Sequence, residues 1–111
     1  MSYKKLRPAQ VRVMGRIYKI LFVGDCTIEH ENLGQCDHKK LTIAIQDHQA
    51  PVEEADTLVH EILHAIWHQM SINCGPLDEE PIVRRMTSGF MQVFLDNPEL
   101  LKYLSSIKNK E

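Results

Sequence analysis

The spacing of hydrophobic and polar positions changes once along the chain, from a first half typical of strands to a second half typical of helices. Residues 10–23 (QVRVMGRIYKILFV) alternate loosely between branched or aromatic and polar side chains, and Gly15-Arg16 can form a turn between them. This pattern predicts a β-hairpin. Residues 26–31 (CTIEHE) predict a short third strand, and residues 41–45 (LTIAI) predict a clearer one after a turn at residues 32–34.

Three helices are predicted beyond the break at residues 46–51 (QDHQAP). The second, about residues 79–96, follows a stop at Gly75-Pro76, and the third, about residues 98–108, begins at Asn97-Pro98. The first, about residues 52–70, has an apolar stripe at three- and four-residue spacing, which we expect to pack on the sheet: Val52, Ala55, Val59, Ile62, Leu63, Ile66 and Met70.

Strands followed by helices predict an α+β fold, because the apolar face of the sheet and the apolar stripe of the first helix must cover each other. We expect a small twisted N-terminal sheet, formed from about residues 9–46, packed on the first helix and followed by two further C-terminal helices. No internal repeat or linker divides the 111 residues, so a single domain over residues 1–111 is predicted.

The composition excludes several classes of protein. Thirteen basic residues against fifteen acidic ones give a net charge of −2, which argues against a nucleic-acid-binding domain. The chain has neither the roughly 18 successive apolar residues of a membrane-spanning helix nor the apolar run of a signal peptide, so we expect a cytoplasmic protein with no membrane partner. Three cysteines, an odd number, favour unpaired thiols over a disulfide framework.

Candidate chemistry is concentrated in the first predicted helix, in the sequence His60-Glu61-Ile62-Leu63-His64. Two histidines four residues apart lie on one face of a helix, so their ring nitrogens can bind one zinc ion at about 2.0–2.1 Å. The glutamate between them lies close to such an ion without binding it. We therefore predict His60 and His64 as metal ligands and Glu61 as a catalytic residue.

A third zinc ligand is expected from the second helix, because a catalytic zinc uses three protein ligands and keeps a fourth position open. That helix begins with Glu79-Glu80. At about 100° per residue, Glu79 shares the inward-facing side of the helix with Val83 and Met86, whereas Glu80 shares a side with Arg84. The helix phase favours Glu79, and Glu80 is the alternative.

The segment TLVHEILHAIWH (residues 57–68), preceded by a strand such as LTIAI and followed by a helix that begins with two glutamates, resembles the small HEXXH zinc metallopeptidases of the gluzincin type. It is most similar to ImmA/IrrE-like and phage-borne minimal metallopeptidase domains, over about residues 41–94. The resemblance implies a minimal zincin-like fold, with the two histidines and a downstream glutamate on zinc and the motif glutamate as general base. His68 also matches a histidine found in many such domains.

The chemistry predicted from these residues is zinc-dependent hydrolysis of peptide bonds in a protein or peptide substrate. Zinc lowers the pKa of a bound water toward about 7, and Glu61 takes the proton and then delivers it to the leaving amine. The strand at residues 41–45 is expected to be a sheet edge to which an extended substrate could add. Two other classes stay open: a catalytically weak or silent zinc-binding module that holds a peptide in the same cleft, and a structural helix bundle with a fortuitous motif.

Other metal-binding side chains have weaker patterns. Cys26, His30, Cys36 and His38 suit zinc chemically, but their spacing matches no closed structural site, so we favour ordinary unliganded residues. His68 lies one turn beyond His64, where it could be a fourth ligand, although a polar neighbour of the site is favoured.

Plainer roles are also expected for the remaining conspicuous side chains. His48 and Tyr103 could assist an oxyanion, but lone residues of these types are more often surface or packing groups. We expect Trp67 and a set of methionines to form core or cleft wall: Met70, Met86 and Met91.

Overall fold

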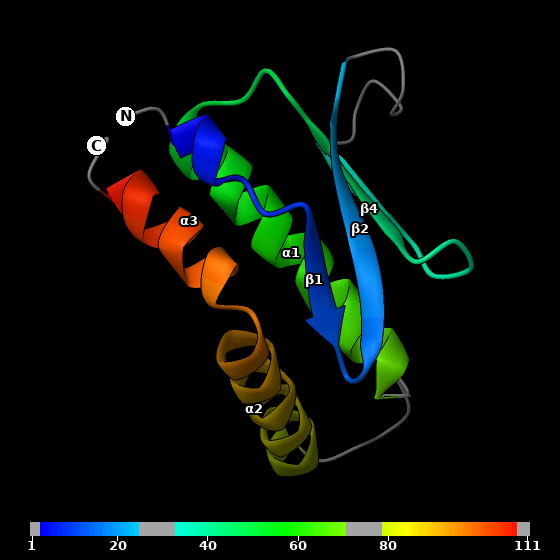
Figure 1. The fold of residues 1–111 in the computed structure, drawn as a ribbon. Coiled ribbons are helices and arrows are strands. Elements are labelled where there is room, and N and C mark those ends of the chain that lie inside the picture. Colours follow the sequence, from blue (N-terminus) through cyan, green and yellow to red (C-terminus); the bar gives the residue numbers. More distant parts are fainter. Residues whose placement is uncertain (1–2, 25–32, 71–78, 109–111) are drawn as a thin grey trace.

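The computed structural model describes residues 3–24, 33–70 and 79–108, together with their side chains except those of residues 79–81 and 83. A short 3-10 helix, η1 (Tyr3–Leu6), precedes four strands and three α-helices (Figure 1). The strands are β1 (Gln10–Val13), β2 (Arg16–Val23), β3 (Gly34–Asp37) and β4 (Thr42–Gln46). The helices are α1 (Pro51–Gln69), α2 (Glu79–Asp96) and α3 (Pro98–Lys108), and each lies within one residue of its predicted range. The fold is therefore α+β, as predicted.

The four strands form one mixed sheet in the order β1-β2-β4-β3. The predicted hairpin is confirmed, since β1 and β2 pair antiparallel with Val13 opposite Arg16. Its turn lies one residue earlier than expected, at Met14 and Gly15, which both have positive φ, as a two-residue hairpin with right-handed twist requires. Strand β2 pairs parallel with β4, and β4 pairs antiparallel with β3.

The position of β4 corrects one prediction. The strand expected at residues 41–45 exists, but it lies between β2 and β3 and so is not a sheet edge. Among the described residues the outer strand on that side is β3, which lies where the sequence predicted the end of a turn. Its sequence, GQCD, has no apolar alternation, so pattern analysis could not find it. The third strand expected at residues 26–31 lies outside the described residues.

Helix α1 lies between the sheet and the other two helices (Figure 1). It contacts β1, β3 and β4 on one side and α2 and α3 on the other, while α2 also contacts β1 and α3 contacts η1. No described helix is both long and apolar enough to cross a membrane.

The buried face of α1 differs from the predicted stripe. Val52 is 47% exposed, and three polar side chains, Glu54, Thr57 and Glu61, are buried instead. Coverage on two sides explains the difference, because a helix between two layers can bury residues beyond a single apolar stripe. The rest of its buried face is apolar: Ala55, Leu58, Ile62, Ala65 and Ile66.

The hydrophobic core lies between the sheet and α1 and continues beneath α2 and α3. Val93 of α2 and Leu100, Tyr103 and Ile107 of α3 are buried, whereas Leu101 is exposed. The sheet contributes alternating residues of its strands, as a half-covered sheet should: Val11, Val13, Tyr18, Ile20, Ile43 and Ile45.

A buried charge cluster holds the start of α1. The Glu54 side chain is completely buried, and its carboxylate accepts hydrogen bonds from Tyr103 Oη at 2.6 Å and Arg7 Nε at 3.1 Å. Arg7 Nη2 pairs with the other Glu54 oxygen and lies 2.7 Å from Asp47 Oδ1. The guanidinium also lies 4.2 Å from the centre of the Phe22 ring. This cluster joins the segment after η1, the loop before α1, and α3.

A close approach between α1 and β3 positions the middle of the helix. A Cβ atom added at Gly34 would lie 2.8 Å from Thr57 Cγ2 and 3.2 Å from Glu61 Cγ. The Thr57 methyl cannot easily move, because the single hydroxyl hydrogen of Thr57 lies between two acceptors, Gln49 Oε1 at 2.8 Å and the Glu53 carbonyl oxygen at 2.9 Å. Any side chain at position 34 would therefore push α1 away from the outer strand.

Replacing Glu54 by Gln tests the charge cluster. Loss of one partner from a buried ion pair leaves the Arg7 cation incompletely neutralised, so we expect the free energy of unfolding to fall by about 3 kcal/mol. Urea unfolding monitored by circular dichroism measures this. The matched control is Glu53→Gln on the exposed side of the same turn, which should change stability by less than about 0.5 kcal/mol. Equal effects of the two changes would contradict the structural role of the cluster.

Replacing Gly34 by Ala tests the close approach. We expect a loss of about 1–3 kcal/mol in unfolding free energy, as for other overpacked sites. The control is Gly24→Ala, since a Cβ atom there meets nothing within 4 Å. Thermal unfolding of both variants provides the comparison, and a Gly34→Ala protein as stable as the Gly24→Ala protein would show that the strand and helix separate at little cost.

Candidate metal centre

The two motif histidines converge on the exposed side of α1. Their Nε2 atoms lie 3.2 Å apart, and the rings are nearly perpendicular, with 4.9 Å between centroids and 77° between planes. Two nitrogens bound at about 2.0–2.1 Å to a tetrahedral ion lie about 3.3 Å from each other. The geometry of His60 and His64 therefore fits a shared zinc ion.

Glu61 differs from the two motif histidines in its burial. Its side chain is only 6% exposed and lies against β3 at Gly34, whereas His60 and His64 are exposed. Burial raises the pKa of the Glu61 carboxyl, and the two histidines oppose part of that effect. A carboxylate with a raised pKa beside a polar pocket suits a residue that accepts and releases a proton.

A small pocket of about 350 Å³ opens over these three residues. Its other walls come from β3 and the turn after it: Gly34, Cys36 and His38. The sequence indicated Cys36 and His38 only for a different, structural zinc site. Their place beside the motif follows from the pairing of β3 with β4, which no pattern in the GQCD segment predicts.

Cys36 and His38, two members of the alternative structural zinc site, lie close to each other and to Tyr18. His38 Nδ1 lies 3.2 Å from the Tyr18 hydroxyl and 3.7 Å from Cys36 Sγ. Burial, with smaller contributions from Glu61 and Asp37, raises the pKa of Cys36 to about 12. The thiol is therefore neutral at pH 7 in this arrangement and is a poor nucleophile.

Cys26 and His30, the other two members of that site, lie outside the described residues.

The predicted third ligand lies at the first residue of α2. The backbone of this helix begins at Glu79, followed by Glu80, but neither side chain is described. Within the part of the chain that the structure describes, no three His, Cys, Asp or Glu side chains are grouped to hold a metal ion. His60 and His64 stay the two predicted ligands on α1, and the choice between Glu79 and Glu80 as the third also stays a prediction.

His68 is placed beside His38 instead of beside the motif pair. The two rings are parallel within 6°, with 4.0 Å between their centroids. The expected role of His68 as a polar neighbour of the site stays a prediction. Of the two residues considered for oxyanion binding, Tyr103 is buried against Glu54 and His48 is exposed in the loop before α1.

A second, more apolar cavity of about 420 Å³ shares His60 and His64 with the first. Trp67 and Met86 line it together with Leu63, so these two residues form cleft wall, as expected. Of the other two methionines, Met70 packs against the core and Met91 is 52% exposed.

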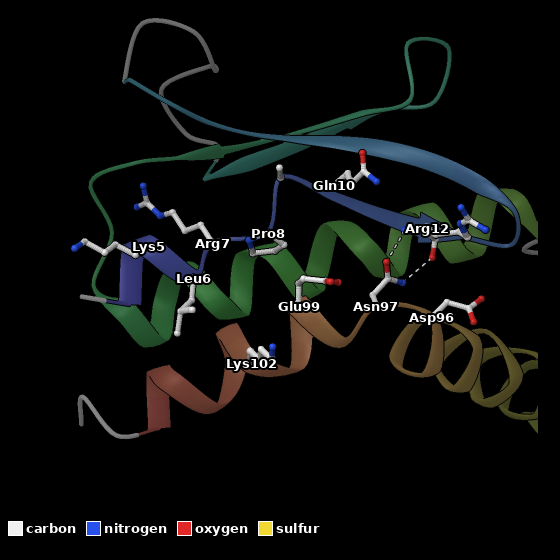
Figure 2. Close-up of a pocket in the computed structure, with 11 residues that line it drawn as sticks. Lys5, Leu6, Arg7, Pro8, Gln10, Arg12, Asp96, Asn97, Glu99 and Lys102 are labelled. Carbon is white, nitrogen blue, oxygen red and sulfur yellow. Dashed lines mark hydrogen bonds between the residues drawn. The ribbon is translucent and has the colours of Figure 1, made fainter. Parts of the chain in front are cut away.

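A larger cavity, about 750 Å³, lies elsewhere, between the η1–β1 segment and the junction of α2 and α3 (Figure 2). Its polar groups are engaged in holding the fold: Arg7 binds Glu54, and the Asn97 side chain hydrogen-bonds the Arg12 backbone in both directions. The remaining lining mixes both signs of charge and includes Glu99 and Lys102 of α3. Size alone therefore does not make it the stronger candidate.

Comparison of the chain with protein-family models, with curated proteins and with solved structures finds no match.

Proposed function

We propose that this protein is a zinc-dependent metallopeptidase of minimal zincin-like fold, which hydrolyses peptide bonds of a protein or peptide substrate. His60 and His64 bind the zinc ion with Glu79 as third ligand, and Glu61 is the general base. The observation that carries the proposal is the convergence of the two histidine nitrogens at 3.2 Å above a buried carboxylate.

In the proposed reaction the metal ion and Glu61 have separate roles. A zinc ion at this position supplies Lewis acidity, which makes water more acidic and polarises a carbonyl group. Glu61 accepts the proton of the attacking water and then delivers it to the nitrogen of the leaving amine. Its burial keeps the carboxylate in one place and raises its pKa, so both transfers become easier near neutral pH.

A substrate can be held on β3. This strand, the outermost on its side among the described residues, borders the pocket through Gly34 and Cys36, and an extended peptide added beside it would run past His60 and His64. The strand proposed to pair with an extended substrate is therefore β3. It lies next to the strand at residues 41–45, for which this role was first expected.

The alternative is a catalytically silent zinc-binding module that holds a peptide in the same pocket. The two classes differ at Glu61, because a site that only binds has no need of a buried carboxylate next to its ligands. A purely structural helix bundle differs in having no metal, since the 3.2 Å contact is then a hydrogen bond between one protonated and one unprotonated nitrogen.

Metal binding tests the ligand set. We expect one zinc ion per chain by elemental analysis, and a zinc concentration a hundred times the Kd should add about 2.7 kcal/mol to stability. Changing His60 or His64 to Ala, or Glu79 to Gln, should lower the affinity for zinc at least about a hundredfold. Mutation of residues that only hydrogen-bond to metal ligands typically lowers metal affinity by roughly 10–100-fold.

The controls for metal binding are Glu80→Gln and His48→Ala, which should retain zinc. Loss of zinc in Glu80→Gln but not in Glu79→Gln would show that Glu80, and not Glu79, is the third ligand. A wild-type protein that binds no zinc would overturn the proposed function altogether.

Changing Glu61 to Gln tests catalysis separately from metal binding. The amide keeps the shape of the side chain but cannot accept the proton, so cleavage of a quenched fluorescent peptide library should fall by about 10²–10⁴-fold. Zinc content should stay at one ion per chain. A Glu61→Gln protein that cleaves as fast as wild type would remove the general base from the mechanism, and a zinc-loaded wild type that cleaves no peptide would favour the silent module.

A further inference from the structure

The imidazole of His38 is fixed beside the pocket by groups that the proposed function does not use. His38 lies in the turn between β3 and β4. This turn is held by Asp37, whose Oδ1 accepts hydrogen bonds from the backbone nitrogens of Lys39 and Lys40, both at 3.0 Å. The backbone that carries His38 is therefore ordered independently of any metal.

Tyr18 determines which ring nitrogen of His38 carries the proton. This tyrosine is completely buried, and its hydroxyl oxygen accepts a hydrogen bond from Gln69 Nε2 at 2.9 Å. The hydroxyl hydrogen then needs an acceptor of its own, and among the described residues His38 Nδ1, 3.2 Å away, can provide it. In that arrangement Nδ1 accepts the bond and the neutral imidazole carries its hydrogen on Nε2.

Stacking fixes the plane of the same ring. His68 lies parallel to His38 within 6° at 4.0 Å, so the imidazole cannot rotate without losing this contact. The ring lines the pocket together with His60, Glu61 and His64. Since Tyr18 takes up Nδ1, the nitrogen available to a molecule in the pocket is Nε2, as a donor.

We propose that His38 is a further catalytic residue, whose neutral imidazole donates an Nε2–H hydrogen bond to the carbonyl oxygen of the scissile amide as negative charge develops on that oxygen. The proposal rests on the proposed function. Tyr18 is a positioning residue, because it acts on the reaction only through the tautomer of His38.

The step balances without proton transfer from His38. The water oxygen forms a bond to the carbonyl carbon, and the π electron pair of the C=O bond moves to oxygen while Glu61 takes the proton. When the C–N bond breaks, that electron pair returns to re-form the C=O bond, and Glu61 gives the proton to the amine nitrogen. His38 keeps its hydrogen throughout, and a fixed donor aimed at such an oxygen accelerates acyl transfer by about 10²–10³-fold.

The alternative role for His38, as the third metal ligand, requires the opposite tautomer. A histidine that binds a metal through Nε2 has its hydrogen on Nδ1, where an acceptor fixes it. Because the Gln69 amide donates to the Tyr18 oxygen, the Tyr18 hydroxyl keeps a hydrogen that it can donate to Nδ1. The two roles of His38 are therefore distinguished by the position of a single proton.

Long-range ¹H–¹⁵N NMR of the labelled full chain locates that proton, before and after addition of zinc. We expect the hydrogen of His38 on Nε2 in both states. Tyr18→Phe removes the donor to Nδ1 and should produce a mixture of tautomers, whereas the control Tyr103→Phe, which removes an equally buried hydroxyl bonded to Glu54, should leave His38 unchanged. A hydrogen on Nδ1, or a His38 nitrogen that binds the metal, would overturn the proposal.

Kinetics on the best-cleaved peptide of the library provides the second test. His38→Leu should lower kcat about 10²–10³-fold with KM and zinc content unchanged. His38→Gln, whose side-chain amide can place an N–H near the former Nε2, should recover most of this loss, and His48→Leu should behave as wild type.

The outcomes separate this proposal from the one it rests on. If the wild type binds zinc and cleaves while His38→Leu cleaves equally fast, His38 is not catalytic and the proposed function stands. If His38→Leu loses zinc, His38 is a ligand and this proposal fails. If the wild type neither binds zinc nor cleaves, both proposals fail together.

Discussion

The close contact between α1 and β3 at Gly34 is the constraint on which the candidate site depends. Without a side chain at position 34, Thr57 and Glu61 lie directly on the outer strand. The Glu61 carboxylate is thereby buried, while His60 on the same turn stays exposed. The same contact brings the strand that leads to His38 next to the motif. A helix displaced by the width of one side chain would leave Glu61 solvated and would take the pocket apart.

Helix α1 buries a carboxylate at each of two positions, and the surroundings give them different properties. Glu54 is neutralised by Arg7 and hydrogen-bonded by Tyr103, so its charge is used to join three parts of the chain. Glu61 lies beside His60 and His64 and faces a pocket. A carboxylate that is fully paired with a cation and a hydroxyl is not free to bind a substrate or a proton. Glu54 is therefore structural, whereas Glu61 is available for chemistry.

Much of the fold was predictable from the sequence, because its information is local. The spacing of apolar residues and the proline and glycine stops located all three helices, and the alternation at residues 10–23 located the hairpin. Strand β3 was missed since GQCD carries neither alternation nor branched side chains, and its strand conformation comes from pairing with β4. The interior position of β4 was not predicted either, because its outer neighbour, β3, was not predicted. A strand cannot be recognised as internal until its second neighbour is known.

For the candidate site, the sequence by itself determined the convergence of His60 and His64, since a four-residue spacing on a helix brings two rings together wherever the helix packs. Only the tertiary structure decided what surrounds them: the burial of Glu61, the pocket wall from β3, and the pairing of His38 with Tyr18 and His68. These depend on contacts between residues that are 20 or more positions apart. Such contacts arise from the packing of the sheet on α1, which no local pattern encodes.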